Sequence, residues 1–320
     1  MPKQAAIDPQ KFAEIWKQAG GRQFEVAKIL GRSPSSVGNT RLRVEKKLGI
    51  TLHASSVHSA RNAQLRRQNA RRMSLDMKDG TVIVFSDAHY WPGVISTAHR
   101  GLVELIKRLK PDVVVNNGDA FDGARISRHD RIGWDKRPTV KEELDACTER
   151  LGEVWKAAGS ARLVWCLGNH DMRVDNRLAA LVPEFEDVQG FKLVDHFPEW
   201  QFGVLLTIND SVWVLHSWHN GIHATHNNAL KGAVSMVTGH LHSGKVTPWT
   251  NARETVYGVD CGTLADPDGD QFDDYMRCTP RNWRSSFAVL TFRDGKLLLP
   301  ELAQVWDEDH IQFRGELIAV

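Results

Sequence analysis

The chain has 320 residues, of which 42% are hydrophobic and 25% charged, a balance that excludes a wholly disordered protein. No apolar run approaches the ~20 residues that span a bilayer, no signal peptide opens the sequence, and the four cysteines form no CxxC pair. We therefore expect a soluble cytoplasmic protein without a membrane partner or a disulfide framework.

Charge is distributed unevenly. Residues 1–80 hold 16 Lys and Arg against 6 Asp and Glu, a net charge of +10. The remaining residues hold 25 basic and 33 acidic side chains, a net charge of −8. This split predicts a basic module that binds a polyanion, joined to a body whose acidic groups partly hold metal.

Residues 9–50 carry three helical patterns, of which the first ends at Gly20-Gly21 and the second at Gly31. Ser33 and Pro34 suit the N-cap and first position of the third helix. Residues 9–50 thus resemble the helix-turn-helix domains of phage and bacterial DNA-binding proteins, whose second motif helix enters the major groove, and we expect this domain to span residues 1–50. A small bundle for packing or oligomerisation is the alternative. The residues expected to face DNA are Ser36, Asn39, Thr40 and Arg43.

Residues 51–78 are polar and rich in arginine, without a regular apolar face. We interpret them as a basic linker, which either touches phosphates or is only a solvated tether. The body is then expected to span residues 79–320.

Strands and helices alternate in the body. Apolar runs rich in β-branched residues predict buried strands at 81–85, 113–115, 163–166, 212–215 and 235–237. A capping box, Thr139-Val-Lys-Glu142, opens a long helix whose inward face is expected to include Trp155. Asn209-Asp210 and Asp294-Gly295 predict hairpins. We expect an α/β fold with two stacked mixed sheets flanked by helices.

A polar motif follows each of these five runs. The motifs are Asp87-Ala-His89, Gly118-Asp119-Ala-Phe-Asp122, Gly168-Asn169-His170-Asp171, His216 and Gly239-His240-Leu-His242. Ligands of open α/β sheets bind outside the carboxyl ends of the strands, so carboxylates and imidazoles gathered there predict a cage for divalent metal. Oxygen and imidazole ligands without thiolate favour Mn²⁺, with iron, Zn²⁺, Mg²⁺ or Ni²⁺ as alternatives.

In order and placement, these motifs resemble the calcineurin-like metallophosphoesterase superfamily over residues 79–265. The resemblance implies a four-layer sandwich with two metal ions. It implies that Asp119 bridges the ions. The implied ligands of the first ion are Asp87, His89, Asp119 and His242, and those of the second are Asp119, Asn169, His216 and His240.

The resemblance also implies a mechanism. A water held between the metals loses a proton and attacks phosphorus in line. His170 is not a ligand in the family pattern and would protonate the leaving oxygen, while Asp122 would orient His170. Protein phosphatases of the superfamily usually read GDxxDRG, whereas Gly123-Ala124 follows Asp122 here, which argues against a protein-phosphatase role.

Three hypotheses for function remain. The leading one is a nuclease or phosphodiesterase that acts on DNA in a bacterial or phage-infected cell, with substrate contacts from Arg125, Arg128 and Arg173 and stacking by Trp134. The second is a phosphatase or phosphodiesterase for small esters or phosphoproteins, with the helical bundle used for oligomerisation. The third is a DNA-binding regulator with a vestigial site. The sequence does not determine the oligomeric state.

Overall fold

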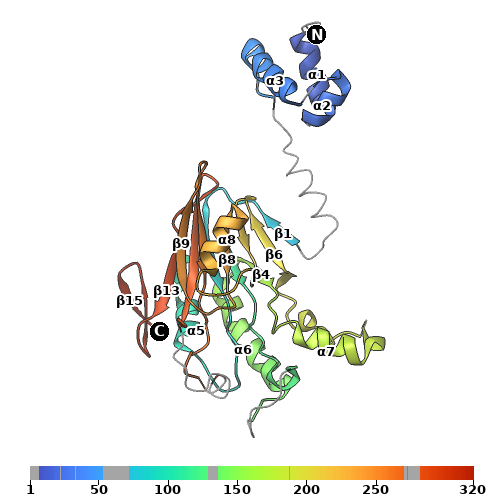
Figure 1. Cartoon of the computed structure of the whole chain (residues 1–320). Helices are drawn as coiled ribbons and strands as arrows, with labels where there is room; N and C mark the ends of the chain where they lie inside the picture. Colours follow the sequence, from blue (N-terminus) through green and yellow to red (C-terminus); the bar gives the residue numbers. More distant parts are fainter. Residues whose placement is uncertain are drawn as a thin grey trace. The chain divides into compact units, whose positions relative to one another are not determined.

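The chain divides into two compact units, Met1–Ala70 and Arg71–Val320. The computed structural model describes residues 7–21, 23–32, 34–52, 72–128, 136–186, 188–269, 272 and 282–320 (Figure 1). Within these ranges, no helix combines the length and apolar character needed to cross a bilayer.

The N-terminal unit contains the three expected helices, α1 (Pro9–Gln18), α2 (Gln23–Leu30) and α3 (Pro34–Leu48). Its core is built around Phe12 and Trp16, which stack with ring centroids 5.9 Å apart. Asn39 and Arg43 are exposed on α3 as expected, whereas Ser36 and Thr40 are half-buried. The Thr40 hydroxyl donates a hydrogen bond to the carbonyl of Ser36. The predicted N-cap Ser33 and most of the predicted linker lie outside the described residues.

The body contains two sheets. The nine-stranded sheet has the order β15-β14-β13-β11-β2-β3-β4-β5, with β12 paired to β11. The six-stranded sheet has the order β1-β6-β7-β8-β10-β9. The bounds of the first sheet are β2 (Gly80–Phe85), β3 (Val113–Asn116), β4 (Arg162–Cys166), β5 (Gln201–Gly203), β11 (Ser286–Arg293), β12 (Lys296–Leu297), β13 (Glu301–Val305), β14 (His310–Phe313) and β15 (Glu316–Ala319). Those of the second are β1 (Arg72–Leu75), β6 (Leu205–Ile208), β7 (Val212–Val214), β8 (Ser235–Thr238), β9 (Lys245–Thr250) and β10 (Thr255–Asp260).

Helices cover the outer faces of the stacked sheets. α5 (Thr97–Leu109) and α6 (Val140–Ala158) contact each other, and α8 (Ala224–Gly232) lies against β8, β9 and β10 (Figure 1). Strand alternation explains the layers: Val82 and Val84 of β2 pack between the sheets, whereas Ile83 and Phe85 pack in the core that includes α5 and α6. The remaining short helices are α7 (Arg173–Leu181), η1 (Ala124–Ile126), η2 (Pro183–Phe185) and η3 (Leu193–His196). The predicted α/β fold with two stacked sheets is confirmed.

Local sequence signals account for several boundaries. Thr139 and Glu142 form the predicted capping box of α6. The Asn209-Asp210 turn joins antiparallel β6 and β7, and both residues have positive φ, as the expected turn type requires. Asp294-Gly295 joins β11 to β12 in the same way.

Two expectations are wrong. Trp155 does not point inward but is 47% exposed. Residues 72–75 are not linker: they form β1, which pairs in parallel with β6, and Met73 is buried in the core between the sheets. The polar composition of the preceding residues hid this edge strand, because a four-residue strand needs only one or two buried side chains.

Candidate metal centre

Five loops at strand ends supply the site. Strands β2, β3 and β4 run parallel in one sheet, and β7 and β8 run parallel in the other. The carboxyl ends of parallel strands share one sheet edge, so the loops that follow them converge. The side chains brought together are Asp87 and His89 after β2, Asp119 and Asp122 after β3, His170 after β4, His216 after β7, and His240 and His242 after β8.

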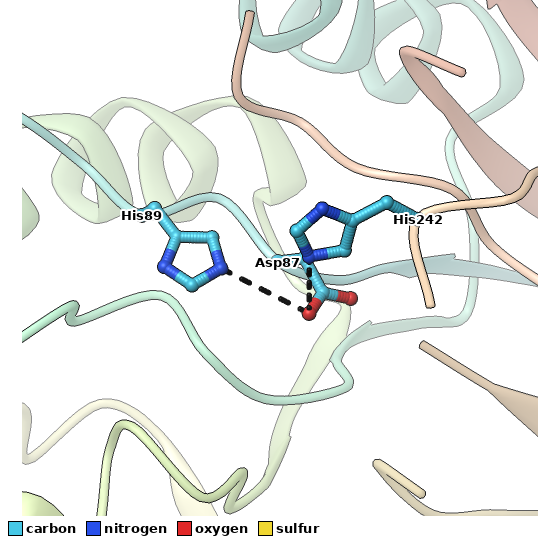
Figure 2. A group of neighbouring side chains, drawn as sticks. All are labelled: Asp87, His89 and His242. Carbon is cyan, nitrogen blue, oxygen red and sulfur yellow. Dashed lines mark ion pairs between the residues drawn. The ribbon is translucent and has the colours of Figure 1, made fainter. Parts of the chain in front are cut away.

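The first subsite consists of Asp87, His89 and His242 (Figure 2), whose candidate ligand atoms lie within 4.8 Å of one another. Asp87 Oδ1 is 3.1 Å from His242 Nε2 and 4.0 Å from His89 Nε2. All three residues are buried. Burial lowers the pKa of His89, so this imidazole is neutral and able to bind a cation.

The second subsite consists of Asp119, His216 and His240, again within 4.8 Å. Asp119 Oδ2 is 3.0 Å from His216 Nε2. Burial works against a charged His216, but Asp119 and Asp87 outweigh it and raise the pKa of His216 to about 10. Burial also lowers the pKa of His240. His216 Nε2 lies 4.0 Å from Asp87 Oδ1, so the two subsites adjoin.

Each carboxylate has one oxygen held by the protein and one left for another partner. Asp87 Oδ2 accepts hydrogen bonds from the Ser86 hydroxyl and the His240 amide, which leaves Oδ1 buried without a hydrogen bond. Asp119 Oδ1 accepts the His170 amide at 2.8 Å, which leaves Oδ2 facing His216. A buried, unsatisfied carboxylate oxygen is costly unless an ion or proton occupies it.

Two of the imidazoles show the same division, with one ring nitrogen bonded by the protein and the other left for another partner. His89 Nδ1 is 2.8 Å from Asp122 Oδ1, and His216 Nδ1 donates to the Asn117 carbonyl at 2.8 Å. In both rings Nε2 is buried and lacks a hydrogen-bond partner. A metal-bound histidine is normally oriented by a hydrogen bond at its other nitrogen. These orphaned atoms therefore fit divalent cations at both subsites.

The glycines of two motifs are needed because the carboxylates pack directly on them. A Cβ at Gly239 would lie 1.8 Å from Ser86 Oγ and 2.4 Å from Asp87 Oδ2. A Cβ at Gly168 would lie 2.1 Å from Asp119 Oδ1. Any side chain at either position would displace a candidate ligand.

Backbone strain is concentrated in these loops. Asp87, His89, Asp119, His240 and His242 all have left-handed φ, between 40° and 70°. Asp and His tolerate this region better than most residues, yet each such conformation costs about 1 kcal/mol or more. Surrounding hydrogen bonds must hold the loops in place.

His170, Asp122 and Arg173 form a connected group beside the subsites. Asp122 Oδ1 is 2.9 Å from His170 Nδ1 and also bonds His89, so this one oxygen orients two imidazoles. Burial opposes ionisation of Asp122, but hydrogen bonds from His170 and His89 hold its pKa well below the usual range. Burial likewise disfavours charge on His170, yet Asp122 and Asp119 raise its pKa. Arg173 Nη2 lies 3.1 Å from His170 Nε2, and Nη1 donates to the Asp122 carbonyl.

Asp171 is a structural residue whose role the sequence did not reveal. It is 1% exposed and accepts hydrogen bonds from the amides of Asp119, Phe121 and Gly168 and from the Trp165 indole. It thus ties the loop after β3 to the loop after β4. The sequence places this carboxylate directly after a predicted ligand motif, which was the available signal for a role near the site. Its hydrogen-bond partners could not be predicted, because the tertiary structure brings them together.

The remaining predicted residues are placed as follows. Asn169 is exposed, and its assignment as a ligand stays a prediction, as does the sharing of Asp119 between two ions. Arg125 and Arg128 are exposed, and Trp134 lies outside the described residues. Ser36, Asn39, Thr40 and Arg43 belong to the N-terminal unit.

Solved structures with a similar fold include the following three. Zinc-complexed Vps29 from Entamoeba histolytica is 13% identical, covering 75% of this chain and 98% of its own, with a TM-score of 0.40. YfcE, a phosphoesterase from E. coli, is 16% identical, with coverages of 69% and 97% and a TM-score of 0.31. A dimetal phosphatase from Danio rerio is 11% identical, with coverages of 70% and 94% and a TM-score of 0.35.

No curated protein matches the sequence. The family model described as calcineurin-like phosphoesterase matches residues 80–252. This range begins with β2 and includes every residue of both subsites together with Asp122 and His170. The chain therefore belongs to the calcineurin-like phosphoesterase family.

Proposed function

We propose that the chain is a two-metal phosphodiesterase that hydrolyses DNA. One observation carries the proposal: buried candidate ligand atoms of both subsites, Asp87 Oδ1 and His89 Nε2 in the first and His216 Nε2 in the second, lack hydrogen-bond partners in the described part of the chain. Asp87, His89 and His242 would hold one ion. Asp119, His216 and His240 would hold the other, with Asp119 shared and Asn169 added as predicted from the sequence.

When bound, divalent cations supply stabilisation of the phosphoryl charge and lower the pKa of a water nucleophile. The protein groups have separate tasks. His170 Nε2 accepts from Arg173 Nη2, so the proton is available there only when the substrate draws the guanidinium away. The ring, charged beside Asp122, then delivers the Nε2 proton to the leaving oxygen, while Asp122 holds the proton on Nδ1. Arg173 is half-buried beside His170, and its guanidinium binds a phosphoryl oxygen of the substrate.

DNA is the proposed substrate because of the basic N-terminal unit. The exposed surface of α3 carries Arg43, Lys46 and Lys47, close along the helix to Asn39. Cations on a helix that can enter the major groove bind phosphates, and a neighbouring amide can contact a base. Arg125 and Arg128 add exposed cations to the body.

The direct test incubates the full chain and Mn²⁺ with labelled single- and double-stranded DNA, with bis-p-nitrophenyl phosphate as a small diester. We expect metal-dependent cleavage of both DNA and the small ester. Turnover of the small ester without cleavage of any DNA would contradict the DNA proposal and favour the small-ester alternative. Absence of all hydrolysis with DNA binding retained would favour the regulator.

A charge-reversal pair tests the role of α3. Arg43→Glu with Lys46→Glu on α3 is compared with Lys11→Glu with Lys17→Glu on α1, where both lysines are exposed. We expect the α3 variant to lower DNA affinity by about 10- to 100-fold near physiological salt and to leave small-ester hydrolysis intact. Equal losses in both variants would show that only total charge matters.

A further inference from the structure

Two aromatic side chains flank the first subsite, and no sequence motif pointed to them. The Phe272 ring lies 5.5 Å from the His89 ring and 6.1 Å from the His242 ring, between centroids. The Trp283 ring lies 4.4 Å from His242 and 5.0 Å from Phe272. Phe272 is buried, but Trp283 is only half-buried and keeps part of its surface accessible.

Backbone contacts fix Trp283 in this place. The amide of Arg284 donates to the His242 carbonyl at 2.7 Å, and the Arg284 carbonyl accepts the Thr263 amide at 3.0 Å. The Arg284 guanidinium donates to the carbonyl of Ser243. Trp283 is therefore attached to the loop that carries His242, and its indole has a defined position beside the subsite.

Ring contacts around the first subsite indicate which part of a substrate Trp283 would meet. His170 lies 4.8 Å from His89, His89 lies 5.5 Å from His242, and His242 lies 4.4 Å from Trp283. The proposed proton donor thus neighbours His89, whereas Trp283 neighbours His242, so the two side chains border different candidate ligands of the first subsite. We therefore expect a group resting on Trp283 to differ from the leaving group that receives the proton from His170.

We propose that Trp283, backed by Phe272, is a stacking surface for a ring on the substituent that remains attached to phosphorus. This inference rests on the proposed phosphodiesterase function and names its substrate class: diesters whose retained side carries a nucleobase or aryl ring. A flat indole beside a phosphate site accepts any base, because every base has a π-face.

The test uses substrates with one leaving group and different retained groups. Methyl p-nitrophenyl phosphate and thymidine 5′-p-nitrophenyl phosphate both release p-nitrophenolate, so the same absorbance reports both. We expect the unchanged chain to prefer the thymidine ester. Trp283→Ala should lower the ratio of the two kcat/KM values by about 5- to 100-fold, the range expected for lost stacking on a base.

Further variants separate stacking from packing. Trp283→Phe keeps a flat ring, so the ratio of kcat/KM for the thymidine ester to that for the methyl ester should stay within about threefold of the original value. Trp283→Leu keeps apolar volume but no flat ring, so the preference for the thymidine ester should disappear. Trp306→Ala removes a tryptophan that is 62% exposed elsewhere and should leave the ratio unchanged. Metal content measured by mass spectrometry should stay equal in all four variants.

A binding measurement keeps this inference separate from the proposed function. Calorimetry compares thymidine 5′-phosphate with methyl phosphate on the Mn²⁺-treated chain, and Trp283→Ala and Trp283→Leu should remove the preference. Equal loss of both kcat/KM values, or loss of metal in these variants, would overturn the inference and leave Trp283 as a support for His242. If no ester is hydrolysed, the proposed function fails, and the binding preference alone decides this inference.

Discussion

The two metal subsites are built from the same residue types, one aspartate and two histidines each, but their electrostatics differ. In the first, burial keeps His89 neutral, and Asp122 orients it. In the second, Asp119 and Asp87 keep a proton on His216, whose Nδ1 donates to the neutral Asn117 carbonyl rather than to a carboxylate. A cation therefore meets a neutral ring at His89, whereas binding at His216 displaces a proton. Similar ligand sets can thus bind metal with different affinity and pH dependence.

Asp119→Asn should have the largest effect and tests how separate the subsites are. It removes the anionic oxygen facing His216, and kcat/KM for a diester should fall roughly 10⁴-fold or more, about 5.5 kcal/mol in the barrier. Metal analysis should find fewer than two ions per chain. Retention of one tightly bound ion would assign Asp119 to the second subsite alone, and weakening of both would support a bridging role. A kcat/KM equal to that of the unchanged chain would contradict the proposed metal centre.

His170→Asn should lower kcat by about 10²- to 10⁴-fold, because a positioned general acid is lost. Both subsites should keep their metal, because neither metal-ligand group requires the His170 ring. Kinetics with leaving groups of different pKa provide the measurement, since a good leaving group needs less protonation. Loss of metal in this variant would refute the role assigned to His170.

Asp122→Asn sharpens the contrast between the subsites. It weakens the hydrogen bond that orients His89 but leaves the carbonyl that orients His216. Metal affinity at the first subsite should therefore fall about 10- to 100-fold while that of the second stays within a few-fold. Competition against a chelating dye, read as two binding steps, gives both values. An equal drop at both subsites would show that Asp122 acts on the whole centre.

The smallest expected effect is a difference in pH dependence. His216 must lose its proton to bind a cation, and its pKa is raised to about 10. Below that pKa, the metal affinity of the second subsite should therefore rise by up to about tenfold per pH unit. The metal affinity of the first subsite should rise by a smaller factor per pH unit. Calorimetry in buffers of different ionisation enthalpy counts the protons released.

The raised pKa of His216 can also be checked through the stability of the metal-free protein. Because the pKa of His216 in the folded protein lies above the ordinary histidine value of 6.5, protonated His216 stabilises the metal-free fold fully below about pH 6.5. That contribution is lost as the pH rises through about 10. Urea unfolding of metal-free protein should show it, and a His216→Gln variant should not.

The sequence predicted the parts of the centre that depend on local pattern. Strand runs of β-branched residues and the motifs after them placed Asp87, His89, Asp119 and the later histidines on converging loops. Tertiary contacts determined the rest. Asp171 binds amides of three residues, and Trp283 reaches His242 from a distant segment, so neither has a signature in spacing. The edge strand β1 was missed for a related reason, because its partner β6 lies far along the chain.

The left-handed backbone of the five ligand-bearing positions has a consequence for the speed of cation uptake. A loop free to relax would leave this conformation, but hydrogen bonds within the protein, to Asp171 and from Ser86, hold it without using a ligand atom that faces an ion. Little ordering is then required on arrival. The rate of loading should follow the water-exchange rate of the incoming ion rather than a rearrangement of the chain.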